Sequence, residues 1–308
     1  MGRRNKKGRN ITGIIVIDKP NGRSSNNVLQ QVKRLFDAKK AGHTGSLDPL
    51  ATGVLPICLG EATKLSAYLL DGDKRYHVTC QLGVITDTGD ADGEVLEQLS
   101  IPNLTQQQLR DVIEQFRGKQ GQVPPMYSAL KHKGQPLYNL ARQGIEVERK
   151  SREVTIYDIE LISFTADSFT LDVSCSKGTY IRTLVGDISH VLGTGGHVTM
   201  LRRMESAGYE ITKAISIEQL ETIAEQGIAV LDKQLLPSEE ALPDWPSITI
   251  DDQQISALRH GQTIQVLDYY KSAKIRLFDQ QNTFLGLGEM TETGTVSPKR
   301  VFVVDETS

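Results

Sequence analysis

One carboxylate stands in a loop that is rich in glycine. Residues 42–53 read GHTGSLDPLATG, and Asp48 is the only acidic residue between Asp37 and Glu61. The lysines and the histidine around it would hold this carboxylate ionised, as suits a group that attacks a carbon atom. The same residues also suit an Asx-type turn, in which Asp48 only binds neighbouring amides. The spacing alone leaves the nucleophile and the turn open.

The chain lacks the motifs of the commoner cofactor and metal enzymes. It contains no GxxxxGK[ST] loop, no strand–GxGxxG–helix unit and no HExxH pair. Its six histidines show no ligand spacing, and the HxE and CxxC pairs of a zinc deaminase are missing. The simplest enzymatic prediction is therefore a reaction that uses neither a cofactor nor a metal ion.

The charge is distributed unevenly along the chain. The net charge of −3 alone would argue against a nucleic-acid-binding protein. However, residues 1–80 hold 14 Lys and Arg against 6 Asp and Glu, and residues 116–150 hold 7 against 2. Because salt limits the reach of a charge to about 10 Å, such blocks can bind phosphate locally. Ordinary solvated surface is the alternative interpretation of the same blocks.

Several features predict a protein of the cytoplasm. No apolar run reaches the ~18 residues of a membrane-spanning helix. The basic N-terminus is not followed by the apolar stretch and cleavage site of a secretory signal. The three cysteines form no CxxC pair and indicate a reducing compartment.

The elements that flank the loop can be predicted from periodicity. The apolar run at 11–18 predicts a buried strand, and Ser24 or Ser25 can cap the helix that follows it. Residues 74–82 alternate as a strand does, and residues 180–192 predict an amphipathic helix. Further strands are expected at 154–163, 168–174 and 197–204, and a helix within 100–116 with Thr105 as a possible cap.

Composition divides the chain into parts. Residues 1–10 predict a flexible basic arm, and residues 117–150 an extended surface insertion. Residues 214–246 are acidic and carry prolines, as is typical of a linker region. The short strands expected within residues 247–308 indicate a small β-barrel. The prediction is an α+β protein of two domains.

The loop around Asp48 resembles the catalytic motif of the TruB family of pseudouridine synthases. Other stretches resemble further motifs of that family, and their shared order and spacing carry the resemblance. They are Lys19-Pro20, Lys74-Arg75-Tyr76, the acidic turn TDTGDADG at 86–93, PPMYSALK at 124–131, KGTYIRTL at 177–184 and HVTMLRR at 197–203.

The resemblance implies a fold and a reaction. The fold is the pseudouridine synthase fold at 11–246, a mixed and mainly antiparallel sheet with flanking helices and loops, followed by a PUA-like RNA-binding domain at 247–308. The reaction isomerises uridine to pseudouridine at position 55 in the T loop of tRNA, after base flipping. Breakage of the C1′–N1 bond depends on an aspartate, and C1′ then joins C5. No cofactor, membrane or obligate protein partner is implied, and the chain is expected to be a monomer.

Two rival functions stay open. The first is a non-catalytic RNA-binding or tRNA-folding protein on the same scaffold. The second is a nucleoside glycosidase, which could also use a carboxylate.

The resemblance also assigns roles to residues. Asp48 is the catalytic carboxylate, Arg182 pairs with it, and Tyr76 stacks on the flipped uracil and assists removal of the C5 proton. Four residues are implied to bind the substrate: His43, Tyr180, Leu201 and Lys19, of which Lys19 could either support the loop or contact phosphate. The basic residues expected to bind RNA are Lys64, Lys131, Lys133, Arg142, Arg149 and Lys150. No residue is assigned to a metal ion.

Overall fold

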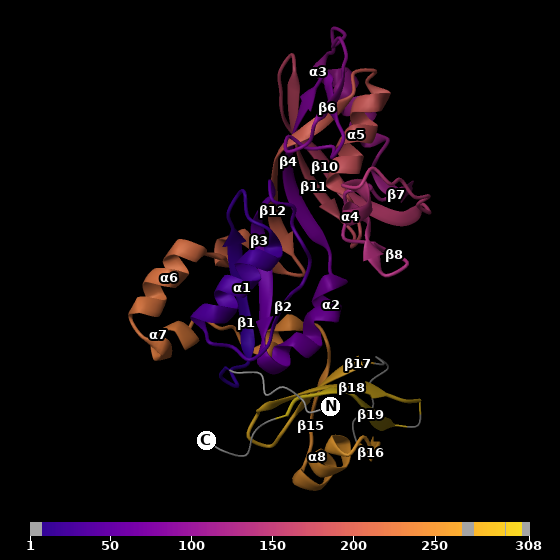
Figure 1. Ribbon diagram of the computed structural model, residues 1–308. Coiled ribbons are helices and arrows are strands. Elements are labelled where there is room, and N and C mark those ends of the chain that lie inside the picture. Colours follow the sequence, from indigo (N-terminus) through magenta and orange to yellow (C-terminus); the bar gives the residue numbers. More distant parts are fainter. Residues whose placement is uncertain (1–7, 267–273, 293, 304–308) are drawn as a thin grey trace.

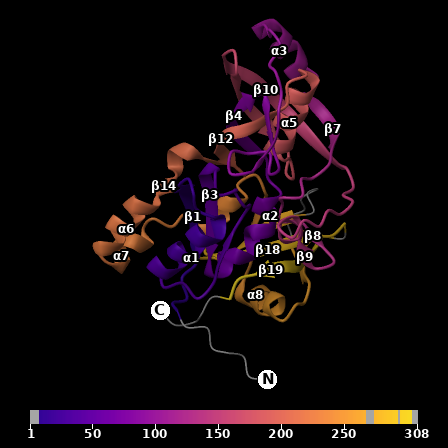
Figure 2. The same cartoon turned by 45° about the horizontal axis from the view of Figure 1, so that its top comes forward.

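A mixed sheet of ten strands runs through most of the molecule (Figure 1). The computed structural model describes residues 8–266, 274–292 and 294–303. Residues 1–7 of the predicted basic arm therefore lie outside the described residues. The strand order is β14 (Ile215–Ser216), β1 (Gly13–Lys19), β3 (Thr52–Leu59), β12 (Gly196–Ser206), β4 (Lys74–Leu82), β11 (Ser168–Cys175), β10 (Arg152–Phe164) and β7 (Gly118–Gln122). Figure 2 shows this progression from β14 on the left to β7 on the right.

Most neighbouring strands of this sheet are antiparallel. The parallel pairs are β1 with β14 and β3 with β12. Two short strands join from the side: β2 (Ala41–His43) pairs with β3, and β13 (Tyr209–Glu210) pairs with β12. The family-based prediction of a mixed, mainly antiparallel sheet is confirmed.

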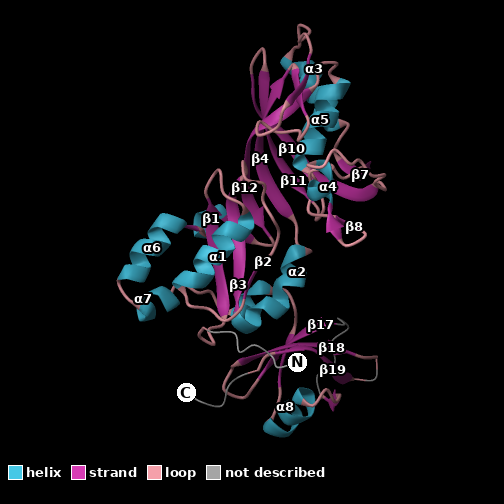
Figure 3. Cartoon of the chain, viewed as in Figure 1, coloured by secondary structure: helices cyan, strands magenta, loops and turns pink. Residues whose placement is uncertain are grey.

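Strand β1 is buried on both faces, which explains the apolar run from Ile14 to Ile17 within it. Ile15 and Ile17 pack with α1 (Ser25–Leu35), α6 (Ile217–Glu225) and α7 (Ile228–Asp232). Figure 3 shows these three helices together beside one end of the sheet. Ile14 and Val16 point to the other face and pack with the 3-10 helix η1 (Gly60–Leu65), with α2 (Ser66–Leu70) and with C-terminal residues.

Strand β4 buries only one of its faces. Tyr76 begins a row that continues through Val78, Cys80 and Leu82 into a core shared with α5 (Ile181–Val191) and α3 (Gln106–Glu114). The predicted strand at 74–82 is confirmed. The helix expected within 100–116 is also confirmed, and it begins after Thr105, whose side chain caps it.

The region expected to be a surface insertion contributes in part to the main sheet. Its first strand, β7, pairs with β10. The rest forms a hairpin of β8 (Lys131–His132) and β9 (Gln135–Pro136) and the short helix α4 (Leu137–Ala141). The acidic turn at 86–93 lies between β5 (Val84–Thr86) and β6 (Val95–Gln98), which pair with each other.

The C-terminal residues form a second sheet of five strands. Its order is β15 (Ser247–Thr249), β17 (Lys274–Phe278), β18 (Phe284–Met290), β19 (Thr295–Val301) and β16 (Ile264–Gln265). This curled sheet completes the α+β architecture that the sequence predicts. The helix α8 (Asp252–Arg259) is absent from the prediction, although Asp251 and Gln254 form a capping box at its start.

The C-terminal sheet is docked on the main sheet through apolar side chains. Phe278, Phe284 and Phe302 belong to the same buried cluster as Ile14 and Val54. The stretch 214–246, expected as a linker, includes β14, α6, α7 and the 3-10 helix η3 (Ser238–Ala241), and the 3-10 helix η2 (Ile211–Lys213) directly precedes it. None of the helices in the described part of the chain is both long and apolar enough to cross a membrane.

Candidate active site

The loop that carries Asp48 is held by the start of α1 and the turn before it. The backbone amide of Leu47 donates to the Ser25 hydroxyl at 2.7 Å. The amide of Gly22 donates to the carbonyl of Pro49 at 2.8 Å, and the Asn21 side chain donates to that of Leu50 at 3.1 Å. Leu47 and Leu50 are themselves buried in the core beneath the loop. The carboxylate is thus presented by a firmly fixed backbone.

Lys19 supports this loop and is not placed to meet a phosphate group. Its side chain is fully buried, and its ammonium group donates to the carbonyls of Pro20, Arg23 and Pro49 at 2.9, 2.5 and 3.2 Å. Of the two roles that the sequence left open for Lys19, the structure places it in loop support. All three contacts are to protein carbonyls, which favours loop support, and the assignment of Lys19 to substrate binding stays an untested prediction.

Arg182 joins three segments that are distant in sequence. Its Nε lies 2.9 Å from Asp48 Oδ2, and its Nη1 lies 3.3 Å from Asp90 Oδ2. The guanidinium group also donates to the carbonyls of Thr88 and Tyr127, each at 2.7 Å. Its side chain is only 7% exposed. Arg182 therefore ties the Asp48 loop, the acidic turn and the insertion to the first turn of α5.

Asp48 remains accessible although protein surrounds it. Its side chain is 41% exposed, in contrast to that of Arg182. Burial raises the pKa of Asp48, Arg182 counters this by favouring the charged form, and Asp90 raises the pKa further. A carboxylate oriented by a buried arginine and open to solvent can react with a bound molecule.

Tyr76 and Leu201 form an apolar wall beside the carboxylate. Both side chains are at least 90% buried, and both belong to the core cluster that holds Leu47. Burial raises the pKa of Tyr76, so that its hydroxyl keeps its proton at neutral pH. Tyr180 precedes α5, and Gln122 exchanges two hydrogen bonds with its backbone, at 2.8 and 3.1 Å. The charge of Asp48 raises the pKa of both tyrosines, as expected for hydroxyl groups near the carboxylate.

His43 is half-buried at the end of β2. Burial lowers the pKa of its imidazole, and the positive charge of Arg203 lowers it further. The ring is therefore neutral at pH 7, and stacking or neutral hydrogen bonding suits it better than pairing with a phosphate.

Two residues of this site are missing from the sequence-based assignment. Asp90 is 5% exposed and is the second carboxylate on Arg182. Arg203 is 1% exposed and donates to the carbonyls of Val54 and Gly45, at 2.7 and 3.1 Å. Strand alternation could have revealed Arg203, because it lies two residues after Leu201 and so shares its face.

Gly53 meets Arg203 so closely that no larger residue fits. A Cβ atom there would lie 2.2 Å from the Arg203 carbonyl oxygen, and φ of Gly53 is +98°. We expect Gly53→Ala to lower the free energy of unfolding by about 3 kcal/mol or more, measured by urea denaturation. Gly22→Ala is the matched control, since φ is +76° there but no atom lies within 4 Å. Gly22→Ala should lower the free energy of unfolding by only about 1 kcal/mol. An equal loss in the two variants would contradict the proposed clash at Gly53.

The cations expected to bind RNA fall into two groups. Lys64 donates to the Val301 carbonyl at 2.6 Å and pairs with Glu61, and Arg149 pairs with Glu146 at 3.0 Å. These two side chains are thus partly engaged within the protein. The Arg142 guanidinium lies over the Tyr138 ring at 5.7 Å. Four of these residues are exposed on the insertion: Lys131, Lys133, Arg142 and Lys150.

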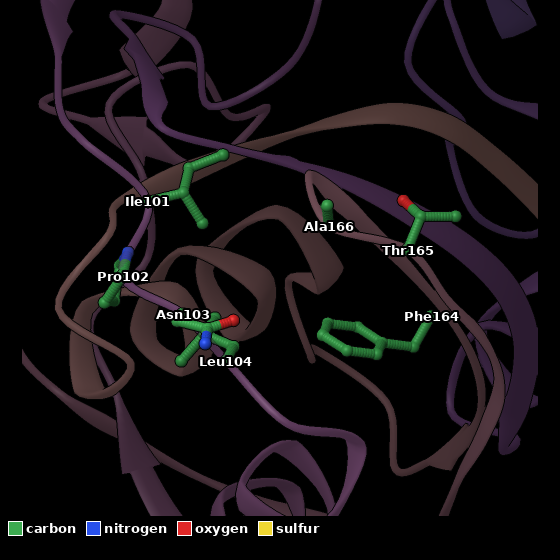
Figure 4. A pocket seen from close by; sticks show the side chains of 7 residues that line it. All are labelled: Ile101, Pro102, Asn103, Leu104, Phe164, Thr165 and Ala166. Atoms are coloured by element: carbon green, nitrogen blue, oxygen red, sulfur yellow. The ribbon is translucent and has the colours of Figure 1, made fainter.

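A pocket of about 560 Å³ lies away from this site, near the tip of the β10–β11 hairpin. Figure 4 shows its lining, which comes from residues 101–104 and 164–166 and includes none of the predicted site residues. In residues 8–266, 274–292 and 294–303, no three His, Cys, Asp or Glu side chains are grouped so that they could hold a metal ion.

Comparison with known proteins covers nearly the whole chain. Residues 33–181 match the model of the TruB family pseudouridylate synthase N-terminal domain. Residues 182–243 match a tRNA pseudouridylate synthase B C-terminal domain, and residues 246–302 match the C-terminal domain of pseudouridine synthase II TruB.

Curated relatives share about half of their residues with this chain. A protein of Saccharophagus degradans named tRNA pseudouridine synthase B is 52% identical over 98% of this chain and 99% of its own length. Proteins of the same name from Nitrosococcus oceani and Vibrio parahaemolyticus are each 50% identical. The first alignment covers 96% of both chains, and the second covers 97% of this chain and 98% of the relative.

Solved structures share the fold. One is described as "Crystal Structure of a Cbf5-Nop10-Gar1 Complex", with a TM-score of 0.70 and 25% identity over 95% of this chain and 84% of that chain. Another is "Structure of H/ACA RNP bound to a substrate RNA containing 2'-deoxyuridine", with a TM-score of 0.72 and 23% identity over 96% of this chain and 86% of that chain. The five-stranded C-terminal sheet and the large mixed sheet thus belong to a known architecture.

Proposed function

The chain belongs to the TruB family of pseudouridine synthases, and from this we propose that it converts uridine 55 in the T loop of tRNA to pseudouridine. It is an RNA pseudouridine synthase and hence an isomerase. The relatives' shared name supports tRNA as the substrate. The single observation that carries the proposal is the exposed Asp48 carboxylate, which lies 2.9 Å from the buried guanidinium of Arg182.

The proposed reaction rearranges two bonds and needs no oxidant. The C1′–N1 bond breaks with the assistance of the Asp48 carboxylate, and the bonding electron pair passes to the base. The uracil turns over, and a C1′–C5 bond forms. C5 then loses its proton while N1 gains one, so that substrate and product are isomers.

The surrounding residues are suited to a flipped base. Extruding the uridine from the RNA costs a few kcal/mol, part of which stacking on Tyr76 recovers at roughly 1–3 kcal/mol per base. Leu201 and Tyr180 flank the same space, and neutral His43 is available to stack against the loop. The exposed cations of the insertion are proposed to bind RNA phosphates.

The test uses tRNA transcripts tritiated at uridine C5. We expect tritium release from the wild-type sequence, and none from a matched transcript with cytidine at position 55. Release of free uracil would indicate a nucleoside glycosidase. Binding without release would indicate an RNA-binding or RNA-folding protein, and release from the cytidine transcript would show another target position. Monomeric action and a cytoplasmic location stay predictions.

A further inference from the structure

Three cations are buried together beneath the proposed uracil site. Lys19, Lys74 and Arg203 are 0%, 8% and 1% exposed. Lys74 donates to the carbonyls of Leu70 and Gly72, as Lys19 and Arg203 donate to other carbonyls. Within the described residues, no carboxylate lies within ion-pair distance of any of the three. We name these three residues the buried cation cluster.

Burying charge without a partner of opposite charge is costly. The effective penalty is several kcal/mol for each ion, and carbonyl contacts repay it only in part. Arg203 also repels both lysines. The pKa of each lysine is lowered to about 8, mainly by burial and further by the positive charge of Arg203. The folded protein nevertheless holds these positive charges in fixed positions. Fixed positive charge is a property of sites that stabilise negative charge as it develops during a reaction.

Arg203 lies directly behind the residue proposed to stack on the base. It is paired with Tyr76 across β12 and β4, so both side chains share one face of the sheet, and the positive charge of Arg203 opposes the rise that burial causes in the pKa of Tyr76. It also donates to the Gly45 carbonyl in the loop of Asp48. On the other side, Arg182 is neutralised by Asp48 and Asp90. The buried cation cluster is therefore positive charge that no ion pair neutralises within the described residues, although the charge of Asp48 acts on Lys19 from a greater distance.

We propose that the buried cation cluster stabilises the negative charge that uracil acquires while its C1′–N1 bond breaks. The electron pair of that bond passes to the base and spreads over N1 and the carbonyl oxygens. It is used again when C5 bonds to C1′. The cluster acts on the base through space, whereas Asp48 assists breakage of the C1′–N1 bond. This inference rests on the proposed uridine substrate.

A substrate with a better leaving group tests the cluster. Fluorine at C5 stabilises the base anion, so cleavage of 5-fluorouridine needs less help from the protein. We expect Arg203→Gln to slow single-turnover consumption of uridine in T-loop RNA by about a hundredfold. Consumption of 5-fluorouridine at the same position should slow by about tenfold or less. A role in holding the loop alone would slow both RNAs equally, and that result would overturn the inference.

Two further variants complete the experiment. Arg202→Gln is the matched control, because Arg202 is the neighbouring arginine but pairs with Asp18 at 2.7 Å; its ratio of the two rates should equal that of the wild type. Lys74 contacts neither Tyr76 nor the Asp48 loop in the contacts described. We expect Lys74→Gln, like Arg203→Gln, to slow uridine more than 5-fluorouridine, but by a smaller factor. Should Arg203→Gln not fold, an unchanged ratio in Lys74→Gln overturns the inference. A wild type inactive on uridine overturns the proposed substrate as well, whereas an active wild type with unchanged ratios overturns the inference alone.

Discussion

Asp48→Asn is expected to abolish tritium release from tRNA, with kcat reduced by about a thousandfold or more. Asparagine has nearly the same shape and can still accept a hydrogen bond from Arg182 Nε, which lies 2.9 Å from the carboxylate. What is lost is the negative charge that assists breakage of the C1′–N1 bond. Because the side chain is 41% exposed, its amide can be solvated and folding should be preserved.

The readout separates chemistry from binding. Tritium release in single turnover reports the reaction, and filter binding of the same tRNA reports affinity, which should stay within a few-fold of the wild type. Asp92→Asn is the control, since Asp92 is an exposed carboxylate close enough for its charge to act on Asp48. It should retain activity. An Asp48→Asn enzyme within tenfold of the wild-type rate would remove the carboxylate from the mechanism.

The elements of the fold could be predicted where the determinants are local. Alternation from Lys74 to Leu82 gives a strand with one buried face, and the Thr105 cap marks the start of α3. The uninterrupted run before Lys19 indicates a strand covered on both sides, as β1 is. Helix α8 could have been recognised from its capping box, but the surrounding short strands obscured it.

The site depends on contacts that no local pattern encodes. Asp48 and Arg182 lie 134 positions apart, and their pairing was expected only from the family resemblance. Arg203 meets Gly45 and Val54 because β12 runs parallel to β3, a neighbour relation that periodicity does not reveal. Lys19 could not be assigned from its sequence neighbours, since its contact with Pro49 depends on the folded loop. Elements follow from local chemistry, whereas the site follows from topology.

Arg182→Met should show the second largest effect, on both activity and stability. The variant leaves Asp48 and the 6%-exposed side chain of Asp90 without their cation, and it removes the donors to the carbonyls of Thr88 and Tyr127. Removing one partner of a buried ion pair costs about 3–5 kcal/mol of unfolding free energy. We expect kcat to fall by about a hundredfold or more, because Asp48 is no longer oriented.

The pH dependence follows from the charge that is removed. In the wild type, Arg182 favours the ionised form of Asp48 and opposes the rise in its pKa caused by burial. Without Arg182, the pKa of Asp48 rises further. Since the reaction needs the ionised carboxylate, the acid limb of kcat/KM should move to higher pH. A smaller displacement is expected for Arg182→Lys, which keeps the charge but not the four-way geometry.

Stability should respond to pH in the opposite sense to activity. A carboxylate that has lost its cation binds a proton more readily in the folded state than in the unfolded state, so lowering the pH favours folding of the variant relative to the wild type. Urea denaturation should therefore show a smaller deficit for Arg182→Met at pH 5 than at pH 8. Arg202→Met, which removes the partly exposed pair with Asp18, should cost about 1 kcal/mol or less. If Arg182→Met lost the same unfolding free energy at both pH values, and if the acid limb of its kcat/KM profile did not move, Arg182 would act by packing and not by charge.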